Sequence, residues 1–165
     1  MPKIHSLVPC LWFDTQAEDA AKLYTSIFEN SRIGHITRYG EAGQEIHGKK
    51  PGSVLTVEFE IDGHPFTALN GGPLFKFTEA ISFQVLCETQ AEIDYFWDKL
   101  SAGGDKNAQQ CGWLKDKFGL SWQVVPASIG EMMRGDPVRA RRAMQAIMTM
   151  VKIDTAILQR AYDGE

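Results

Sequence analysis

Few residues of this chain combine a reactive side chain with a spacing that supports chemistry. The histidines His5, His35, His47 and His64 form no i, i+4 pair and have no carboxylate at metal-ligand spacing. Cys111 has no histidine or acid near it in sequence, and a small buried thiol is a commoner role than a nucleophile. What remains is a set of side-chain amides on predicted strands, which both donate and accept hydrogen bonds.

Two of these amides, Gln84 and Gln123, alternate with large apolar residues. Successive side chains of a strand point to opposite faces, so the apolar set should pack on a helix and leave the amides on the other face. The apolar residues are Ile81, Phe83 and Val85 on the strand Ala80–Cys87, and Trp122 and Val124 on the strand Leu120–Val125. Ser82 and Ser121 share the amide faces. We expect Gln84 and Gln123 to occupy matching places in two repeated units.

The same alternation adds further candidates for a binding site. Asn70 shares the cleft side of its strand with Ala68, and Trp113 offers an aromatic wall. Glu58 is the one candidate acid for catalysis; the alternative is a solvent-facing residue on a half-exposed strand. A few converging polar groups in an apolar concavity suit a small molecule, here a neutral or zwitterionic one. The predicted substrate-binding residues are Asn70, Gln84, Trp113 and Gln123.

The elements that position these residues are indicated by a repeated tetrapeptide. Thr-Gln-Ala-Glu occurs at Thr15–Glu18 and again at Thr89–Glu92, each time after an apolar run. A Thr followed three residues later by Glu predicts a capping box, in which both side chains bind free amides at a helix N-terminus. The sequence therefore predicts two strand-then-helix units.

In both halves of the chain the sequence pattern predicts the element order β-α-β-β-β. The first half has a strand Ile4–Phe13, a helix Thr15–Phe28, strands Arg32–Tyr39, Ser53–Ile61 and His64–Asn70, and a polar loop Glu41–Gly52. The second half has a strand Ala80–Cys87, a helix Thr89–Leu100, a poorly formed strand near Asn107, and strands Cys111–Lys115 and Leu120–Val125 joined by a turn at Asp116–Gly119.

The chain should be one domain over residues 1–165, with modules at 1–73 and 80–127 and a helical extension at 128–165. In the extension, Ser128, Asp136 before Pro137, and Asp154 predict helix starts. An apolar stripe follows, made of Val138, Met144, Ile147, Met148 and Val151. Such a stripe predicts core or subunit packing, and we expect a homodimer.

Composition describes an ordinary globular protein, 44% apolar and 23% charged. A net charge of −4 argues against nucleic acid as the main partner. Three cysteines without a close pair fit a reducing compartment. The N-terminal segment resembles neither a signal peptide nor a membrane span, so we expect a cytoplasmic protein with no membrane partner.

Several stretches resemble a known family. They are PCLWFDTQAEDAAKLYTSIF, LNGGPLFKFTEAISFQV, CGWLKDKFGLSWQVVP and the tail MTMVKIDTAILQRAY. They are similar to the PhnB-like branch of the vicinal oxygen chelate superfamily, whose members carry the label 3-demethylubiquinone 3-methyltransferase-like. The resemblance implies the α+β fold of glyoxalase and bleomycin resistance proteins. In that fold two tandem βαβββ modules form a curved cleft.

Metal-using members of that superfamily, as the resemblance implies, place four ligands on cleft-facing strands, mostly His and Glu. The corresponding positions fall near Leu7 or Pro9, near Phe66 or Ala68, at Ala80 and at Gln123. None of these is a histidine or carboxylate, and one amide oxygen does not hold a divalent ion. His5 has cleft-facing parity and is the alternative ligand. We expect a metal-free cleft without a cofactor.

Three functions stay open. The protein could be an enzyme of the vicinal oxygen chelate class acting on a small organic molecule, or a non-catalytic protein that sequesters one, as resistance proteins of this fold do. The third is the methyltransferase of the family label. No Gly-rich strand-loop-helix signature for S-adenosylmethionine is present. Whether the chain is an enzyme is left open.

Overall fold

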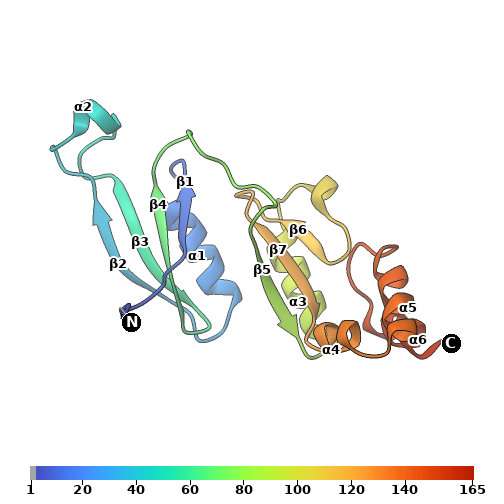
Figure 1. Cartoon of the computed structure of the whole chain (residues 1–165). Helices are drawn as coiled ribbons and strands as arrows, with labels where there is room; N and C mark the ends of the chain where they lie inside the picture. Colours follow the sequence, from blue (N-terminus) through green and yellow to red (C-terminus); the bar gives the residue numbers. More distant parts are fainter. Residues whose placement is uncertain (1–2) are drawn as a thin grey trace. The chain divides into compact units, whose positions relative to one another are not determined.

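The computed structural model describes residues 3–165 and divides into two compact units, Met1–Lys76 and Phe77–Glu165. Met1 and Pro2, the start of the predicted first module, lie outside the described residues. Figure 1 labels the helices and strands of each unit. The α+β fold class predicted from the sequence is confirmed.

The first unit is a four-stranded sheet with one long helix. Its elements are β1 (Cys10–Phe13), α1 (Ala17–Ile27), β2 (Arg32–Arg38), α2 (Gln44–His47), β3 (Val54–Ile61) and β4 (His64–Asn70). The sheet order is β1-β4-β3-β2, with β1 parallel to β4 and the other pairs antiparallel. Helix α1 covers one face, where the fully buried Tyr24 lies beside Phe59, at 6.1 Å between ring centroids. The short helix α2 lies within the predicted loop Glu41–Gly52.

The second unit has a smaller sheet arranged in the same way. Its elements are β5 (Ser82–Cys87), α3 (Gln90–Ser101), a 3-10 helix η1 (Lys106–Ala108), β6 (Trp113–Lys115) and β7 (Ser121–Pro126). The order is β5-β7-β6, with β5 parallel to β7 and β6 antiparallel to it. Helix α3 buries Ile93, Trp97 and Leu100 on the sheet. In both units, therefore, the first strand lies parallel to the last strand.

The strand predicted near Asn107 is wrong, because η1 occupies that position. The Asp105 carboxylate accepts a hydrogen bond from the Asn107 amide at 2.9 Å, and the Ala108 amide donates to the Asp105 carbonyl at 3.1 Å. An aspartate that binds the backbone two residues ahead favours a turn over a strand. The second sheet consequently has three strands where the first has four.

The two Thr-Gln-Ala-Glu copies begin their helices differently. At α3 the predicted capping box is confirmed: Thr89 Oγ1 accepts from the Glu92 amide at 3.2 Å, and Glu92 Oε2 accepts from the Thr89 amide at 2.9 Å. At α1 the prediction is wrong. Gln16 is the N-cap residue and makes no capping bond, and Glu18 pairs with Lys22 at 2.7 Å.

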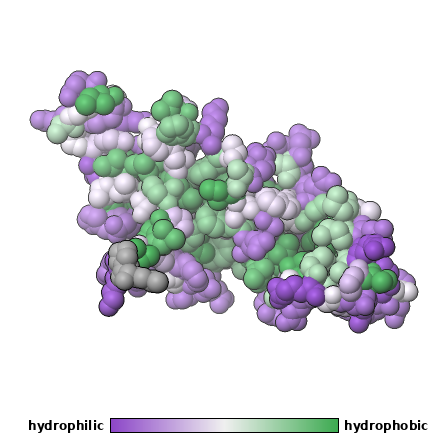
Figure 2. Space-filling view, in the orientation of Figure 1, coloured by the Kyte–Doolittle hydropathy of each residue, from purple (hydrophilic) through white to green (hydrophobic). Residues whose placement is uncertain are grey.

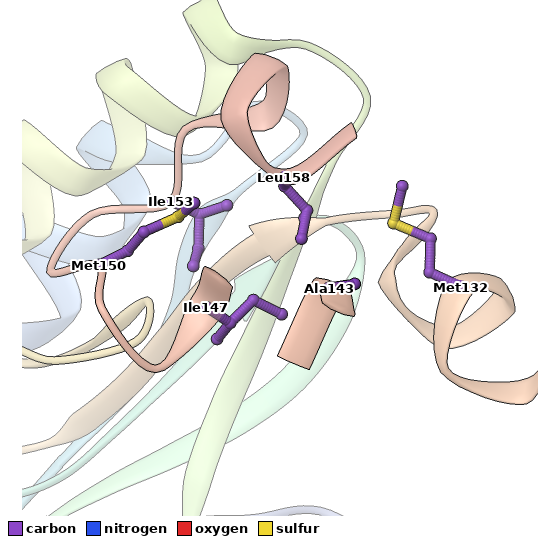
Figure 3. Packing of buried hydrophobic residues seen from close by; sticks show 6 residues of the cluster. All are labelled: Met132, Ala143, Ile147, Met150, Ile153 and Leu158. Carbon is purple, nitrogen blue, oxygen red and sulfur yellow. The ribbon is translucent and has the colours of Figure 1, made fainter. Parts of the chain in front are cut away.

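The C-terminal residues of the second unit form three helices, α4 (Ile129–Arg134), α5 (Pro137–Ile147) and α6 (Thr155–Asp163). The predicted caps are confirmed at Asp136, which accepts from the Val138 and Arg139 amides, and at Asp154, which accepts from the Ile157 amide. Ser128 precedes α4 but makes no side-chain cap. These helices and their connections enclose the small core seen in Figure 3, which consists of Met132, Ala143, Ile147, Met150, Ile153 and Leu158.

The predicted apolar stripe of this tail is divided between two environments. Ile147 belongs to the small core, whereas the other members, Val138, Met144, Met148 and Val151, are exposed. Figure 2 shows mainly hydrophilic side chains over the visible face of this region, with scattered apolar ones among them. None of the helices between residues 3 and 165 combines the length and apolar character that crossing a membrane requires.

Candidate functional site

Three of the predicted site residues come together on the second sheet. Gln84 on β5 lies in register with Gln123 on β7, and Gln123 lies in register with Trp113 on β6. Gln84 Nε2 donates to Gln123 Oε1 at 3.2 Å, and Gln123 Nε2 donates to Ser82 Oγ at 2.7 Å. We call Ser82, Gln84, Trp113 and Gln123 the amide row. The expectation that Gln84 and Gln123 occupy matching places in two units is wrong, since both belong to the second unit.

The amide row lies on the sheet face opposite α3. The residues that alternate with it, Val85, Leu114 and Val124, are buried. Gln84 is exposed, and the other three members are half-buried. Ile81, expected on the helix face, is 70% exposed because β5 begins only at the next residue. Strand alternation therefore leaves a polar, accessible row beside one large aromatic ring.

The amide row keeps hydrogen-bonding capacity for a ligand. Among residues 3–165, neither the Gln84 amide oxygen nor the Trp113 indole N–H is engaged in a hydrogen bond. The first is an acceptor and the second a donor. Because Gln123 is held between Gln84 and Ser82, the central amide is already oriented before a ligand arrives.

The surroundings of the row are close to electrically neutral. Lys115, two residues after Trp113 on β6, pairs with Glu79 at 2.5 Å. The hydrogen bond from Lys115 holds the pKa of the Glu79 carboxyl below its usual range. The lysine thus already has a carboxylate partner.

Ser121 is a polar residue of this face that the predicted site does not include. It lies in register with Ser82 and Lys115, and its side chain is buried with 1% exposure. Its hydroxyl is the one buried side-chain polar atom between residues 3 and 165 without a hydrogen-bond partner. Alternation alone indicates the face of Ser121 but not its burial.

Asn70 has a structural role that the sequence does not reveal. Its side chain is 6% exposed and lies on the face covered by α1, so its assignment and that of Ala68 to the cleft side are wrong. Asn70 Oδ1 accepts from the Ala17 amide at 2.8 Å, and Nδ2 donates to the Val54 carbonyl at 3.1 Å. The amide therefore caps α1 from the end of β4. A ligand role for it stays a prediction.

Asn70 also lines a hollow of about 240 Å³ in the first unit. The other lining residues are Asp14, Thr15, Glu18, Asp19, Tyr39, Lys49, Ser53 and Val54. The Tyr39 hydroxyl donates to the Asn70 carbonyl at 2.6 Å, and Lys49 Nζ lies 4.0 Å from Asp14 Oδ1. Three carboxylates and one lysine contribute charge to this lining, and none of the other predicted site residues belongs to it.

Glu58, the candidate acid, is exposed on β3. Its strand neighbours Val57 and Phe59 are buried under α1, so Glu58 points to the opposite face, beside Thr67 of β4. Within the described part of the chain it has no hydrogen bond or ion pair. An exposed carboxylate without an oriented partner lacks the arrangement of a general acid or base. This geometry favours the solvent-facing alternative.

The donor set does not fit a divalent metal ion. Between residues 3 and 165, no three His, Cys, Asp or Glu side chains gather at ligand distance. Gln123, the one oxygen donor at an expected ligand position, is committed to Gln84 and Ser82. A metal site needs several converging donors. Cys87 does not offer a ready thiolate either, because burial raises its pKa to about 11.

Comparison with known proteins identifies the family. The model of the 3-demethylubiquinone-9 3-methyltransferase family matches residues 5–125. The chain belongs to this family. It is similar to the PhnB protein from Bacillus cereus, with 35% identity and a TM-score of 0.63 over 73% of this chain and 99% of that one. This PhnB-like family is part of the vicinal oxygen chelate superfamily, as predicted from the sequence.

More distant structures share the fold alone. A Pseudomonas aeruginosa protein is 16% identical, with a TM-score of 0.57 over 74% of this chain and 98% of that one. The fosfomycin resistance protein FosX from Mesorhizobium loti is 13% identical, with a TM-score of 0.54 over 80% of this chain and 99% of that one. None of the curated proteins matches the chain. The family match ends at residue 125, so α4, α5 and α6 lie beyond it.

Proposed function

We propose that this PhnB-like protein binds a small neutral organic molecule against the amide row. The observation that carries the proposal is the convergence of Gln84, Gln123 and Trp113, three residues from three strands, on one accessible face. The hydrogen bonds of Gln123 with Gln84 and Ser82 orient the two amides in advance. Preorganised polar groups reduce the entropy that a ligand must lose on binding.

The chemistry of the row favours a planar ring with an amide-like edge. Gln84 offers an acceptor and Trp113 a donor and an aromatic face, whereas no unpaired charge lies in the row. A charged ligand would lose hydration without gaining a counter-ion, which is costly. We therefore expect a ligand such as a cyclic or aromatic amide, rather than a carboxylate or an amine.

Binding without metal chemistry is the form of this function that the donor set supports. Lewis-acid polarisation needs a held ion, and between residues 3 and 165 no three His, Cys, Asp or Glu side chains form a site for one. Sequestering the ligand, or transforming it without a metal, are the two versions that remain. The methyltransferase of the family name is the alternative.

Titration with three molecules that share one ring tests the proposal. Benzamide, benzoate and benzylamine are added to the protein and followed by amide NMR shifts. We expect benzamide alone to shift residues of β5, β6 and β7. Replacing Gln84 or Gln123 with alanine should weaken benzamide about fivefold, the effect of one hydrogen bond of about 1 kcal/mol.

The matched control is Gln145→Ala, since Gln145 is an exposed glutamine of α5. It should leave benzamide binding unchanged. The proposal is contradicted if the protein binds benzoate or benzylamine more tightly than benzamide. It is also contradicted if Gln145→Ala weakens benzamide binding as much as the variants at Gln84 and Gln123 do. A shift with S-adenosylmethionine that exceeds the shift with benzamide would instead favour the methyltransferase.

We also propose that the protein is a cytoplasmic homodimer. The exposed Val138, Met144, Met148 and Val151 of the tail support the dimer. Exposed apolar side chains close in sequence mark an interaction surface more often than isolated ones do. Light scattering should report twice the monomer mass of 18.4 kDa. A monomer at micromolar concentration would contradict the dimer and leave the ligand proposal intact.

A further inference from the structure

The connection between α5 and α6 reaches back to the turn that precedes the amide row. We call this connection, residues 148–154, the α5–α6 loop. The Cys111 amide donates to the Met150 carbonyl at 2.8 Å, and the Gly112 amide donates to the Val151 carbonyl at 2.9 Å. The loop lies beyond residue 125, where the family match ends. Two successive amides of the matched part are thus satisfied by the tail.

The turn needs this support because its backbone is unusual. Cys111 has a φ of +55° and Gly112 a φ of +83°. The left-handed region costs a residue with a Cβ roughly 1–2 kcal/mol, so Cys111 stays there only when its surroundings require it. A Cβ on Gly112 would lie 3.0 Å from the Val124 carbonyl oxygen and 3.1 Å from Ile153 Cγ1. Gly112 is therefore packed between β7 and the tail.

The same turn fixes two members of the amide row. The Trp113 amide donates to the Gln110 carbonyl at 2.8 Å, and the Gln110 amide donates to the Trp113 carbonyl at 3.1 Å. The Gly112 carbonyl accepts from the Val124 amide, next to Gln123, at 2.8 Å. A change in the turn would therefore move Trp113 and reach the backbone beside Gln123.

Gln90 fastens the α5–α6 loop and the first residue of α6 to α3. Its Nε2 donates to the Ile153 carbonyl at 3.1 Å, and its Oε1 accepts from the Thr155 amide at 2.8 Å and the Thr155 hydroxyl at 3.0 Å. An exposed ion pair between Lys152 and Asp94, at 2.6 Å, adds to this attachment. One half-buried side chain thus makes three bonds to the tail, while lying on the helix and not in the row.

We propose that Gln90 and the α5–α6 loop are positioning elements for Trp113, which link docking of the tail to ligand binding at the amide row. This inference rests on the proposed function of the row. The linkage is reciprocal: a ligand that needs the observed position of Trp113 stabilises the docked tail, and a docked tail strengthens binding. The specificity of the site then depends on a segment outside the matched family region.

The test uses Gln90→Ala in the full chain labelled with 5-fluorotryptophan. The ¹⁹F resonance of Trp113 is assigned with Trp113→Phe, and Trp12 of the first unit serves as an internal reference. We expect Gln90→Ala to shift or broaden the Trp113 resonance, leave Trp12 unchanged, and weaken benzamide binding about three- to tenfold. Amide hydrogen exchange at Cys111 and Gly112 should accelerate by a similar factor or more.

The matched control is Gln16→Ala, the same position of the first Thr-Gln-Ala-Glu copy, which should move none of these signals. Thr155→Val, which removes one bond to Gln90, gives a milder form of the same change if Gln90→Ala unfolds. An unchanged Trp113 resonance with unchanged exchange overturns the inference. A changed resonance in a protein whose wild type binds no benzamide supports the positioning role and contradicts the proposed ligand class instead.

Discussion

The two units carry the same tetrapeptide at the start of their long helices. The free backbone amides at those helix starts are hydrogen-bonded by different groups. In the second unit the capping groups are local: Thr89 and Glu92 bind each other's backbone amides. In the first unit the group is distant in sequence, since Asn70 at the end of β4 accepts from the Ala17 amide. The Gln of the tetrapeptide also differs, because Gln90 binds the tail and Gln16 does not.

The two helix starts also differ in their neighbours. At α1 the helix start borders a hollow lined by Asp14, Thr15, Glu18 and Asp19, and Thr15 and Glu18 have no capping role. At α3 the Gln90 side chain of the corresponding end instead binds the Ile153 carbonyl and the Thr155 amide. A duplicated sequence therefore preserves the element order but not the use of each residue.

The largest effect that tests this comparison is expected at Asn70. Asn70→Ala removes both bonds of a buried amide and leaves the Ala17 amide and the Val54 carbonyl without partners. Each unsatisfied buried group costs about 1–3 kcal/mol, so we expect a loss of roughly 3 kcal/mol in the free energy of unfolding. Urea denaturation measures it, with the exposed Asn107→Ala as control. A loss below about 0.5 kcal/mol would mean that α1 is not capped by β4.

A smaller difference in the free energy of unfolding is expected between variants of Thr89 and Thr15, the threonines of the two tetrapeptides. Thr89→Ala deletes an N-cap acceptor, which costs about 1 kcal/mol. Thr15→Ala deletes a hydroxyl without a capping bond and should cost less than about 0.5 kcal/mol. The same denaturation experiment compares the two variants directly. Equal losses would show that both copies cap their helices alike, against the geometry described above.

The sequence predicted the parts of this fold that depend on local pattern. His64–Asn70 is confirmed to the residue, and alternation correctly placed Gln84 and Gln123 opposite Val85 and Val124. Alternation, however, separates two faces without identifying the one that a helix covers. Alternation predicts that Asn70 and Ala68 share the cleft side, whereas α1 covers that face and the Asn70 side chain binds the start of the helix.

Contacts between distant segments account for the other differences. Nothing local to Cys111 and Gly112 indicates a left-handed turn whose amides bind Met150 and Val151. Nothing local to Val138 or Met148 indicates that these residues stay exposed while Ile147 turns inward. The strand predicted near Asn107 failed for a local reason, because Asp105 competes for the backbone amides. Reading Asp105 as a turn former would have corrected it.

The smallest effect is a difference in acid sensitivity between the two glutamates of the repeat. Hydrogen bonds from the Thr89 and Glu88 amides hold the pKa of Glu92 below its usual range, and Lys22 does the same for Glu18. A carboxyl whose pKa is lower in the folded state stabilises the protein above its unfolded pKa, roughly 4.3, and loses that contribution as the pH falls through the folded value. Glu92→Gln should therefore reduce the dependence of the free energy of unfolding on pH between about 5 and 3.

Glu18→Gln should reduce this pH dependence less. In 0.5 M salt the effect of Glu18→Gln should shrink, because the Glu18–Lys22 pair is exposed and screened, whereas the Glu92 carboxylate binds backbone amides. Thermal unfolding over this pH range, with and without salt, measures both slopes. If salt changed the effects of Glu92→Gln and Glu18→Gln equally, both carboxylates would have the same kind of partner, and the two helix starts would not differ in this respect.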